Sequence, residues 1–134
     1  MNRTARGFLA AAAALLAIAT IVGALGAHAL RGVLEARQLA SLDTAVQYQF
    51  FHALGLFGVA LCIAREGDAA AARRLAVAAR LLLAGILCFS GSIYLMLAGA
   101  PRLFGFVTPL GGLLLIFAWL VFGVTMLRSR SAAS

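Results

Sequence analysis

Charged residues are scarce in this sequence, and lysine is absent from it. Only 11% of the 134 residues are charged, 64% are hydrophobic, and the mean hydropathy is +1.05. Soluble domains contain about 25% charged and about 45–50% apolar residues. A chain this short with so few polar side chains cannot cover a water-facing surface. The composition therefore excludes an ordinary soluble domain and favours a membrane protein.

The sequence also lacks the clusters that bind metals or nucleic acids. Its two cysteines, Cys62 and Cys88, lie in apolar runs without a Cys-x-x-Cys pair, and we expect free thiols. The net charge of +7 comes from arginines scattered singly or in pairs at the edges of apolar runs. Such a pattern offers no basic stripe that could follow phosphates. We therefore expect no metal site and no nucleic-acid partner.

Catalytic motifs are missing as well. No nucleophile elbow, phosphate-binding loop or HExxH motif occurs. No carboxylate or arginine lies well inside an apolar run, whereas ion-coupled transporters and proton pumps usually carry carboxylates within the membrane. We therefore expect neither an enzyme nor an ion-coupled transporter.

What the sequence does contain is four long apolar runs. They cover about residues 7–30, 44–64, 81–98 and 109–127, and each has the length needed to cross a bilayer. The first run resembles a secretory signal, with Ala27-His28-Ala29 in the form of a cleavage site, but it is too long for a signal core. We expect it to be retained. The sequence thus predicts a single all-α membrane domain over 1–134, a bundle of four transmembrane helices.

The arginines predict the orientation of these spans. Eight lie in the N-terminal tail, the loop 65–80 and the C-terminal tail: Arg3, Arg6, Arg65, Arg73, Arg74, Arg80, Arg128 and Arg130. The other two loops hold three: Arg31, Arg37 and Arg102. Arginine and lysine are enriched in cytoplasmic loops. We therefore predict that both termini and the loop 65–80 are cytoplasmic (N-in/C-in), in a bacterial inner membrane.

The ends of the spans carry local signals. Thr108 followed by Pro109 is typical of an N-cap and a first helical position, so the fourth helix should begin there. Residues 99–107 then form an apolar loop at the outer interface. In the first loop, 31–43, apolar residues among arginine and glutamine predict a short interfacial helix.

Small residues at four-residue spacing predict where helices pack closely in lipid. Two such rows occur: Ala19/Gly23/Ala27 in the first span and Ala84/Cys88/Ser92 in the third.

Polar side chains gather around His52. Thr44, Tyr48, His52 and Gly55 share one stripe of the second span. Residues of the third span reach a similar depth, and a polar group in hydrocarbon needs a partner. We therefore predict a buried polar network with these members: Gln47, Tyr48, His52, Ser90, Ser92 and Tyr94. The network is either structural or a ligand or proton site. The only tryptophan, Trp119, should fill a helix interface with its indole N–H directed to Ser90.

His28 is a second candidate site residue. Two histidines can hold a haem iron, but both ligands must then lie at similar depth. His28 lies near the outer end of its span, whereas His52 lies about 12 Å into the second. We therefore expect no haem and no other cofactor.

Four motifs resemble those of one known family. They are GAHAL at 26–30, TAVQYQFFHAL at 44–54, FSGSIYL at 89–95 and TPLGG at 108–112. Their order and spacing resemble the domain of unknown function 423 family, small bacterial inner-membrane proteins with eukaryotic relatives called transmembrane protein 256. The resemblance covers roughly residues 7–127, and TAVQYQFFHAL is its most specific part. It implies four membrane helices and a retained first helix, and no catalytic residue can be transferred.

Two functional hypotheses follow. The leading one is an accessory or scaffold subunit of a membrane complex, which has as partners the lipid bilayer and other membrane proteins or further copies of the chain. The alternative is binding or transport of a small apolar or amphipathic molecule, such as a quinone or lipid, near His52.

Overall fold

The fold is entirely helical over the part of the chain that the structure describes. The computed structural model describes residues 1–131, and side chains up to residue 128, so the side chain of Arg130 lies outside the described residues. In chain order the helices are α1 (Arg3–Ala27), η1 (Ala29–Gly32), α2 (Ala36–Arg65), α3 (Ala69–Leu97), η2 (Arg102–Phe106) and α4 (Val107–Ser131), where η marks a 3-10 helix. The four α-helices are long and apolar enough to cross a bilayer. The predicted all-α membrane fold is confirmed.

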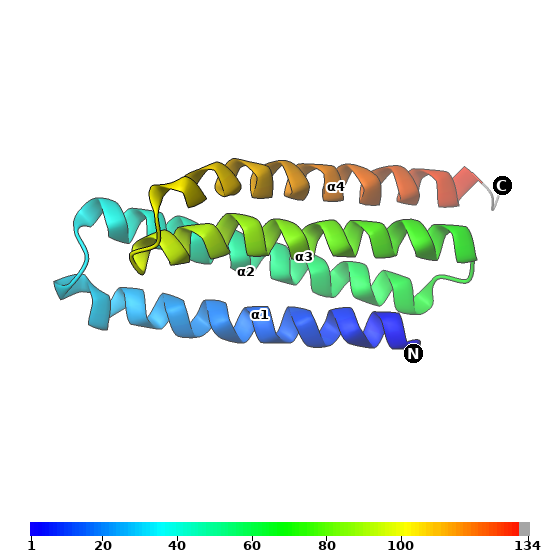
Figure 1. The fold of residues 1–134 in the computed structure, drawn as a ribbon. Helices are drawn as coiled ribbons and strands as arrows, with labels where there is room; N and C mark the ends of the chain where they lie inside the picture. The colour runs from blue at the N-terminus through cyan, green and yellow to red at the C-terminus, as the bar shows by residue number, and fades with distance from the viewer. Residues whose placement is uncertain (132–134) are drawn as a thin grey trace.

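The four α-helices form an open row rather than a closed square. α1 packs against α2, α2 against α3, and α3 against α4 (Figure 1). The N-terminus, the α2–α3 turn and the end of α4 lie together at one end of the molecule along the helix axes, which we call the terminal end. The connections η1 and η2 lie at the opposite, distal end. Each α-helix therefore runs between the terminal end and the distal end.

Side-chain caps explain where α1 and α3 begin. Asn2 Oδ1 accepts a hydrogen bond from the N–H of Ala5 at 2.7 Å, and Asp68 Oδ2 accepts one from Ala71 at 2.7 Å. Both bonds satisfy first-turn N–H groups that have no partner within the helix. The N–H groups of Ala71 and Ala70 lower the pKa of Asp68 from its ordinary 3.8. The cap is therefore a charged one.

A glycine ends α3. Gly99 has a φ of 99°, a left-handed conformation that side chains disfavour, and the Ala100 N–H donates back to Leu95 O at 2.9 Å. Pro101 follows, so the helix cannot continue. The chain then turns into η2.

The helices extend beyond the predicted spans. The segment 65–80, expected as a loop, is helical from Ala69 onward, because Asp68 caps α3 before the apolar run begins. The interfacial helix expected in 31–43 is replaced by η1 and by the first turns of α2. The prediction that Thr108 caps the fourth helix is wrong: α4 begins at Val107, directly after η2. Pro109 is tolerated there because first-turn N–H groups lack helical partners.

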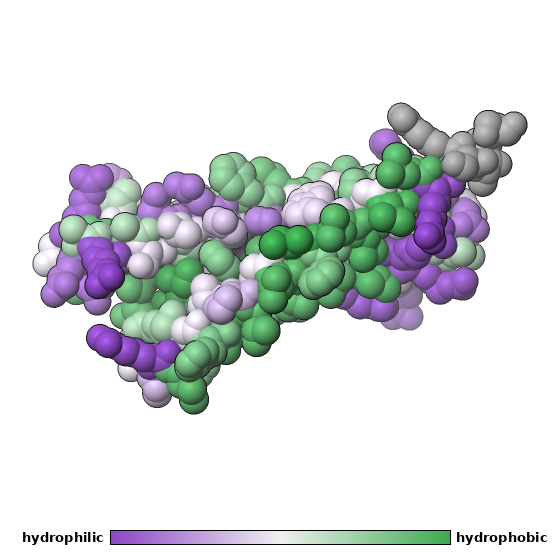
Figure 2. All heavy atoms as spheres, turned by 90° about the horizontal axis from the view of Figure 1, so that it is seen from above, coloured by the Kyte–Doolittle hydropathy of each residue, from purple (hydrophilic) through white to green (hydrophobic). Residues whose placement is uncertain are grey.

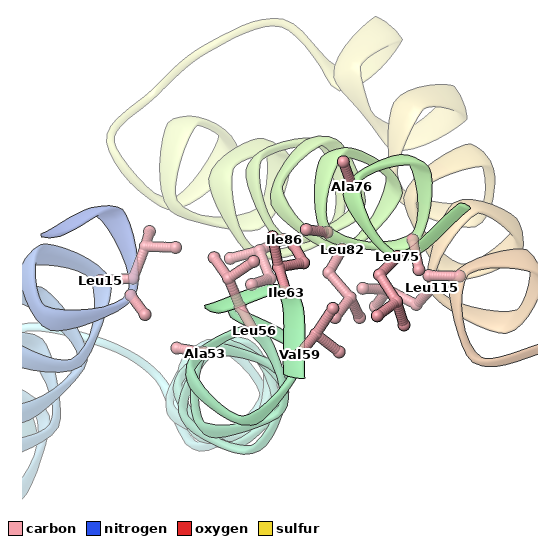
Figure 3. Packing of buried hydrophobic residues seen from close by; sticks show 14 of the residues in the cluster. Leu15, Ala53, Leu56, Val59, Ile63, Leu75, Ala76, Leu82, Ile86 and Leu115 are labelled. Atoms are coloured by element: carbon pink, nitrogen blue, oxygen red, sulfur yellow. The ribbon is translucent and has the colours of Figure 1, made fainter. Parts of the chain in front are cut away.

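The apolar core lies between α2 and α3. Leu56 and Ile63 of α2 face Leu82 and Ile86 of α3, while Leu15 and Leu115 close the two sides from α1 and α4 (Figure 3). On the face seen in Figure 2, hydrophilic residues gather at the two ends of the molecule, and hydrophobic residues cover most of the surface between them.

α1 packs on α2 through small residues. Ala5, Ala12 and Ala19, seven residues apart, are buried, and a Cβ on Gly26 would meet Leu42 Cδ2 at 2.8 Å. Of the predicted row Ala19/Gly23/Ala27, the first two face α2, but Ala27 is exposed. The seven-residue spacing keeps the row on one side of a helix, so Gly26 takes the fourth position.

α4 approaches α3 at a glycine. A Cβ on Gly111 would lie 2.8 Å from the Cα of Phe89, so only glycine allows this backbone distance. Of the predicted row Ala84/Cys88/Ser92, only Ser92 is buried. Cys88, like Cys62, is half-buried and is a free thiol.

Candidate functional site

A buried glutamine links the first three helices. Gln49 is 2% exposed, and its Nε2 donates to the backbone oxygen of Leu15 in α1 at 2.7 Å. The Tyr94 hydroxyl of α3 donates to Gln49 Oε1 at 2.8 Å. One amide thus joins three helices within the membrane. Gln49 was not predicted. It lies on the same face of α2 as Leu42, Ala45 and Ala53, all of which are buried. The helical spacing of these apolar residues was the pattern from which the burial of Gln49 could have been predicted.

Two serines of α3 make further polar contacts between helices. Ser90 Oγ donates to Ala45 O of α2 at 2.7 Å. Ser92 Oγ and Thr108 Oγ1 of α4 are 2.6 Å apart and share a hydrogen bond. Hydrogen bonds of this kind contribute about 0.6–2 kcal/mol each between membrane helices. The side chains of Ser90, Ser92 and Tyr94 therefore each make a hydrogen bond to a neighbouring helix, which stabilises the packing of the bundle.

Gln47 does not join these contacts. It is exposed, and its Nε2 donates to Asp43 Oδ2 one turn earlier on the same helix at 2.9 Å. The reason is helical phase, since two residues rotate the side chain by about 200°. Gln47 thus points away from the side on which Gln49 is buried. The prediction that Gln47 is buried is wrong.

His52 is half-buried and stands apart from Ser90, Ser92 and Tyr94. Its Nδ1 lies 2.7 Å from the backbone oxygen of Tyr48, the one hydrogen bond of the ring among the described residues. A carbonyl oxygen only accepts, so in the neutral ring the proton must be on Nδ1. Nε2 then carries a lone pair. His52 therefore offers one hydrogen-bond acceptor.

Aromatic rings surround His52. Tyr48 stacks on Phe89 with ring centroids 4.2 Å apart and planes at 18°, and it also stacks on His52 at 5.6 Å. The Trp119 ring lies 6.3 Å from His52 on the other side. These rings belong to a groove of about 450 Å³, the aromatic groove, which runs between α2 and α4 over α3. Its lining residues are Tyr48, Phe51, His52, Phe89, Gly112, Leu115, Ile116 and Trp119.

Trp119 covers a gap that a glycine leaves. A Cβ on Gly55 would lie 2.6 Å from Trp119 Cη2, so the indole rests directly on the α2 backbone. The ring also meets Phe122 edge-on at 6.0 Å. The predicted bond from the indole N–H to Ser90 is not found among the described residues; Ser90 instead donates its own proton to Ala45 O. Trp119 is instead 39% exposed and forms a wall of the groove.

His28 lies elsewhere. It is exposed and caps the end of α1 at the distal end, whereas His52 lies in the middle of α2. The structure does not bring the two histidines together. Among residues 1–131, no three His, Cys, Asp or Glu side chains gather as metal ligands. Among the residues that line the aromatic groove, His52 supplies an imidazole, Tyr48 a hydroxyl and Trp119 an indole N–H.

Comparison with known proteins identifies the family. Residues 22–112 match the family described as "Protein of unknown function (DUF423)", which confirms the resemblance. The "UPF0382 membrane protein YwdK" of Bacillus subtilis is 38% identical over 120 residues, covering 90% of this chain and 94% of the relative. A Haemophilus influenzae "UPF0382 membrane protein" is 36% identical, covering 82% and 85% of the two chains.

A third relative bears on localisation. The "UPF0382 inner membrane protein YgdD" of Escherichia coli is 33% identical, covering 95% of this chain and 94% of the relative. Its name agrees with the predicted inner-membrane localisation. No solved structure matches the chain. The chain belongs to this family of membrane proteins of unknown function.

Proposed function

We propose that this member of the family is a non-enzymatic membrane protein that binds an amphipathic ring molecule bearing a hydroxyl group, such as a quinol, in the aromatic groove. The observation that carries the proposal is the hydrogen bond between His52 Nδ1 and Tyr48 O. It orients the imidazole and leaves Nε2 as an acceptor among aromatic rings. Binding sites for small apolar molecules typically combine such walls with a few placed polar atoms.

The walls suit a flat ring. Tyr48 and Phe89 are already stacked, and Trp119 and Phe51 add further aromatic surface. Aromatic pairs contribute about 0.5–1.5 kcal/mol beyond the area that they bury. A ligand hydroxyl that donates to His52 Nε2 would determine how deep the ligand ring lies in the groove.

The groove is also open to the membrane. Phe51 is 65% exposed and Ile116 is 58% exposed, so a ligand dissolved in lipid can enter from the side. No carboxylate or thiol lines the groove, which supports binding rather than catalysis.

The single tryptophan makes the test direct. Trp119 is the only indole in the chain and lines the groove, so its fluorescence reports a bound molecule there. The purified protein is titrated in detergent with 4-octylphenol and with its methyl ether, in which a methyl group replaces the hydroxyl proton and removes the donor. The phenol should bind more tightly by about 5–10-fold, the value of one hydrogen bond of about 1–1.5 kcal/mol.

Two variants complete this test. His52→Leu should remove the preference for the phenol, while His28→Leu, outside the groove, should keep it. Equal binding of phenol and ether by the unmodified protein would refute the proposal. An unchanged preference in His52→Leu would refute it too.

A second candidate function is that of an accessory subunit. It is favoured by a row of small residues on α1 that remains exposed: Ala10, Ala13, Ala17 and Ala24. Their spacings of three, four and seven residues keep them on one side of α1, as in a helix-packing face in lipid. Native mass spectrometry of gently extracted protein should then show a stoichiometric protein partner. Ala13→Leu should remove it, and Ala40→Leu, which adds equal bulk at an exposed site of α2, should not.

A further inference from the structure

A separate hollow lies at the distal end between α2 and α3. It measures about 600 Å³ and is lined by Arg37, Ser41, Thr44, Ile93, Met96, Leu97, Ala100 and Arg102. We call it the distal crevice. Figure 2 shows a notch at this end of the molecule, with hydrophilic residues on both sides of it. None of its lining residues belongs to the aromatic groove.

The rim of the distal crevice is positively charged. Arg37 in the first turn of α2 and Arg102 at the start of η2 both line it, and no acidic residue does. Among the described residues the one ion pair is Arg74–Asp68, at the terminal end. Two guanidinium groups thus share one hollow without a carboxylate partner, an arrangement that favours a phosphate group.

The two hydroxyl groups in the crevice already donate their protons to the backbone, so they are not the donors that would bind a phosphate. Ser41 Oγ donates to Arg37 O at 3.1 Å and Thr44 Oγ1 donates to Ala40 O at 3.1 Å, so both protons are engaged within α2. The donors available to an anion are therefore those of the two arginines. The backbone that leads to Arg102 turns at Gly99, and the bond from Ala100 N–H to Leu95 O closes this turn.

The floor of the crevice is apolar. Ile93, Met96 and Leu97 of α3 line it, and Ile93 is 9% exposed. A free inorganic anion would use the rim and leave this floor empty. A molecule with a phosphate at one end and a hydrocarbon chain at the other uses both.

We propose that the distal crevice binds an anionic phospholipid of the phosphatidylglycerol type. Its phosphodiester lies within reach of Arg37 and Arg102, and one acyl chain lies over Ile93, Met96 and Leu97. A net negative headgroup is preferred to a zwitterionic one, because the ammonium group of a zwitterion offsets the attraction of the two arginines. Basic residues near a membrane surface each contribute about 1 kcal/mol to such binding.

The test measures lipid binding to the full-length protein in detergent by native mass spectrometry. Dioleoyl-phosphatidylglycerol, dioleoyl-phosphatidylcholine and inorganic phosphate are supplied separately. The phosphatidylglycerol adduct should dominate. Arg37→Gln or Arg102→Gln should weaken it by about fivefold and the double variant by about 25-fold.

Arg31→Gln is the matched control. Arg31 is also an exposed arginine of the distal end, but it lines a different hollow, which contains Asp43. This variant should keep the phosphatidylglycerol adduct, as should His52→Leu, because neither side chain lines the crevice. Two measurements separate lost binding from misfolding. Circular dichroism should show that the variants keep their helices, and the double variant Arg37→Lys/Arg102→Lys, which keeps both charges, should keep the adduct.

Three outcomes would overturn the proposal. One is equal retention of phosphatidylcholine and phosphatidylglycerol by the unmodified protein. Another is equal loss of the adduct in Arg31→Gln and in the double variant, which would indicate unspecific attraction of charge. The third is an adduct with inorganic phosphate alone that is as abundant as the phosphatidylglycerol adduct, which would assign the crevice to a soluble anion.

Discussion

The side-chain amide of Gln49 donates to the backbone oxygen of Leu15, and this 2.7 Å bond joins α2 to α1 within the apolar part of the row. The rest of the α1 contact is apolar: the small residues Ala5, Ala12 and Ala19 are buried, and Leu15 joins the core. The same amide accepts from Tyr94, so Gln49 also holds α3. It is thus the polar centre of the fold, although it lies outside the aromatic groove.

Replacing Gln49 by leucine should destabilise the protein by about 1–3 kcal/mol. Two interhelical hydrogen bonds disappear, each contributing about 0.6–2 kcal/mol, and the Tyr94 hydroxyl loses its acceptor. Reversible unfolding in mixed micelles measures the loss. Gln47→Leu is the control and should change stability by less than about 0.5 kcal/mol, because Gln47 is exposed. Equal effects of the two substitutions would contradict the central position of Gln49.

Gly111→Ala should separate α4 from α3. The new Cβ would lie 2.8 Å from the Cα of Phe89, so the helices must move apart and the Ser92–Thr108 bond must lengthen. Overpacking of this kind costs about 1–3 kcal/mol. Gly123→Ala on the same helix meets nothing within 4 Å and should be neutral or slightly stabilising. The same unfolding assay compares the two, and equal stability would argue against the close approach at Gly111.

Reporter fusions should place both termini and the turn at Asp68 in the cytoplasm, with Glu35 and Arg102 outside. The physical reason is the excess of arginine at the terminal end, which resists translocation. A C-terminal fusion that is active in the periplasm would reverse this prediction. Fusions after Arg65 and after Arg102 provide internal controls, since they should report opposite sides.

Stability should fall in acid because of Asp68. Its pKa is lowered in the folded protein by the N–H groups of Ala71 and Ala70. The charged cap therefore stabilises α3 above the pKa of the unfolded chain, about 4, and this contribution disappears as the pH falls through the lower folded value. Unfolding measured at pH 6 and pH 3 should show a drop in the unmodified protein. Asp68→Asn, which still caps but does not titrate near this pH, should show a smaller drop.

The helical fold was predictable because long apolar runs have few other stable structures in a bilayer. The ends of the helices were harder to predict. Hydropathy indicates which residues lie in lipid, whereas capping residues such as Asp68 determine where helical hydrogen bonding begins. For the same reason α3 includes Arg73, Arg74 and Arg80, which were expected in a loop.

The polar residues were harder to place. Ser90, Ser92 and Tyr94 do make contacts between helices, but with Ala45, Thr108 and Gln49 rather than with His52. The stripe containing Tyr48 and His52 seemed to be the buried one because it is polar. In the fold it borders a groove, and the buried stripe is the one that contains Gln49 among apolar neighbours. Depth along a helix can be counted from a sequence, but rotation about its axis depends on which helices are neighbours.

The open row also has a consequence for how the protein is made. Because the main packing partners are consecutive in sequence, each helix that leaves the ribosome finds the helix it docks on already in the bilayer. α2 can dock on α1, α3 on α2 and α4 on α3, with no step that waits for a later segment. Contacts between segments close in sequence also form quickly, since little chain entropy is lost in closing them. Biogenesis can thus follow the order of synthesis from the first helix to the last.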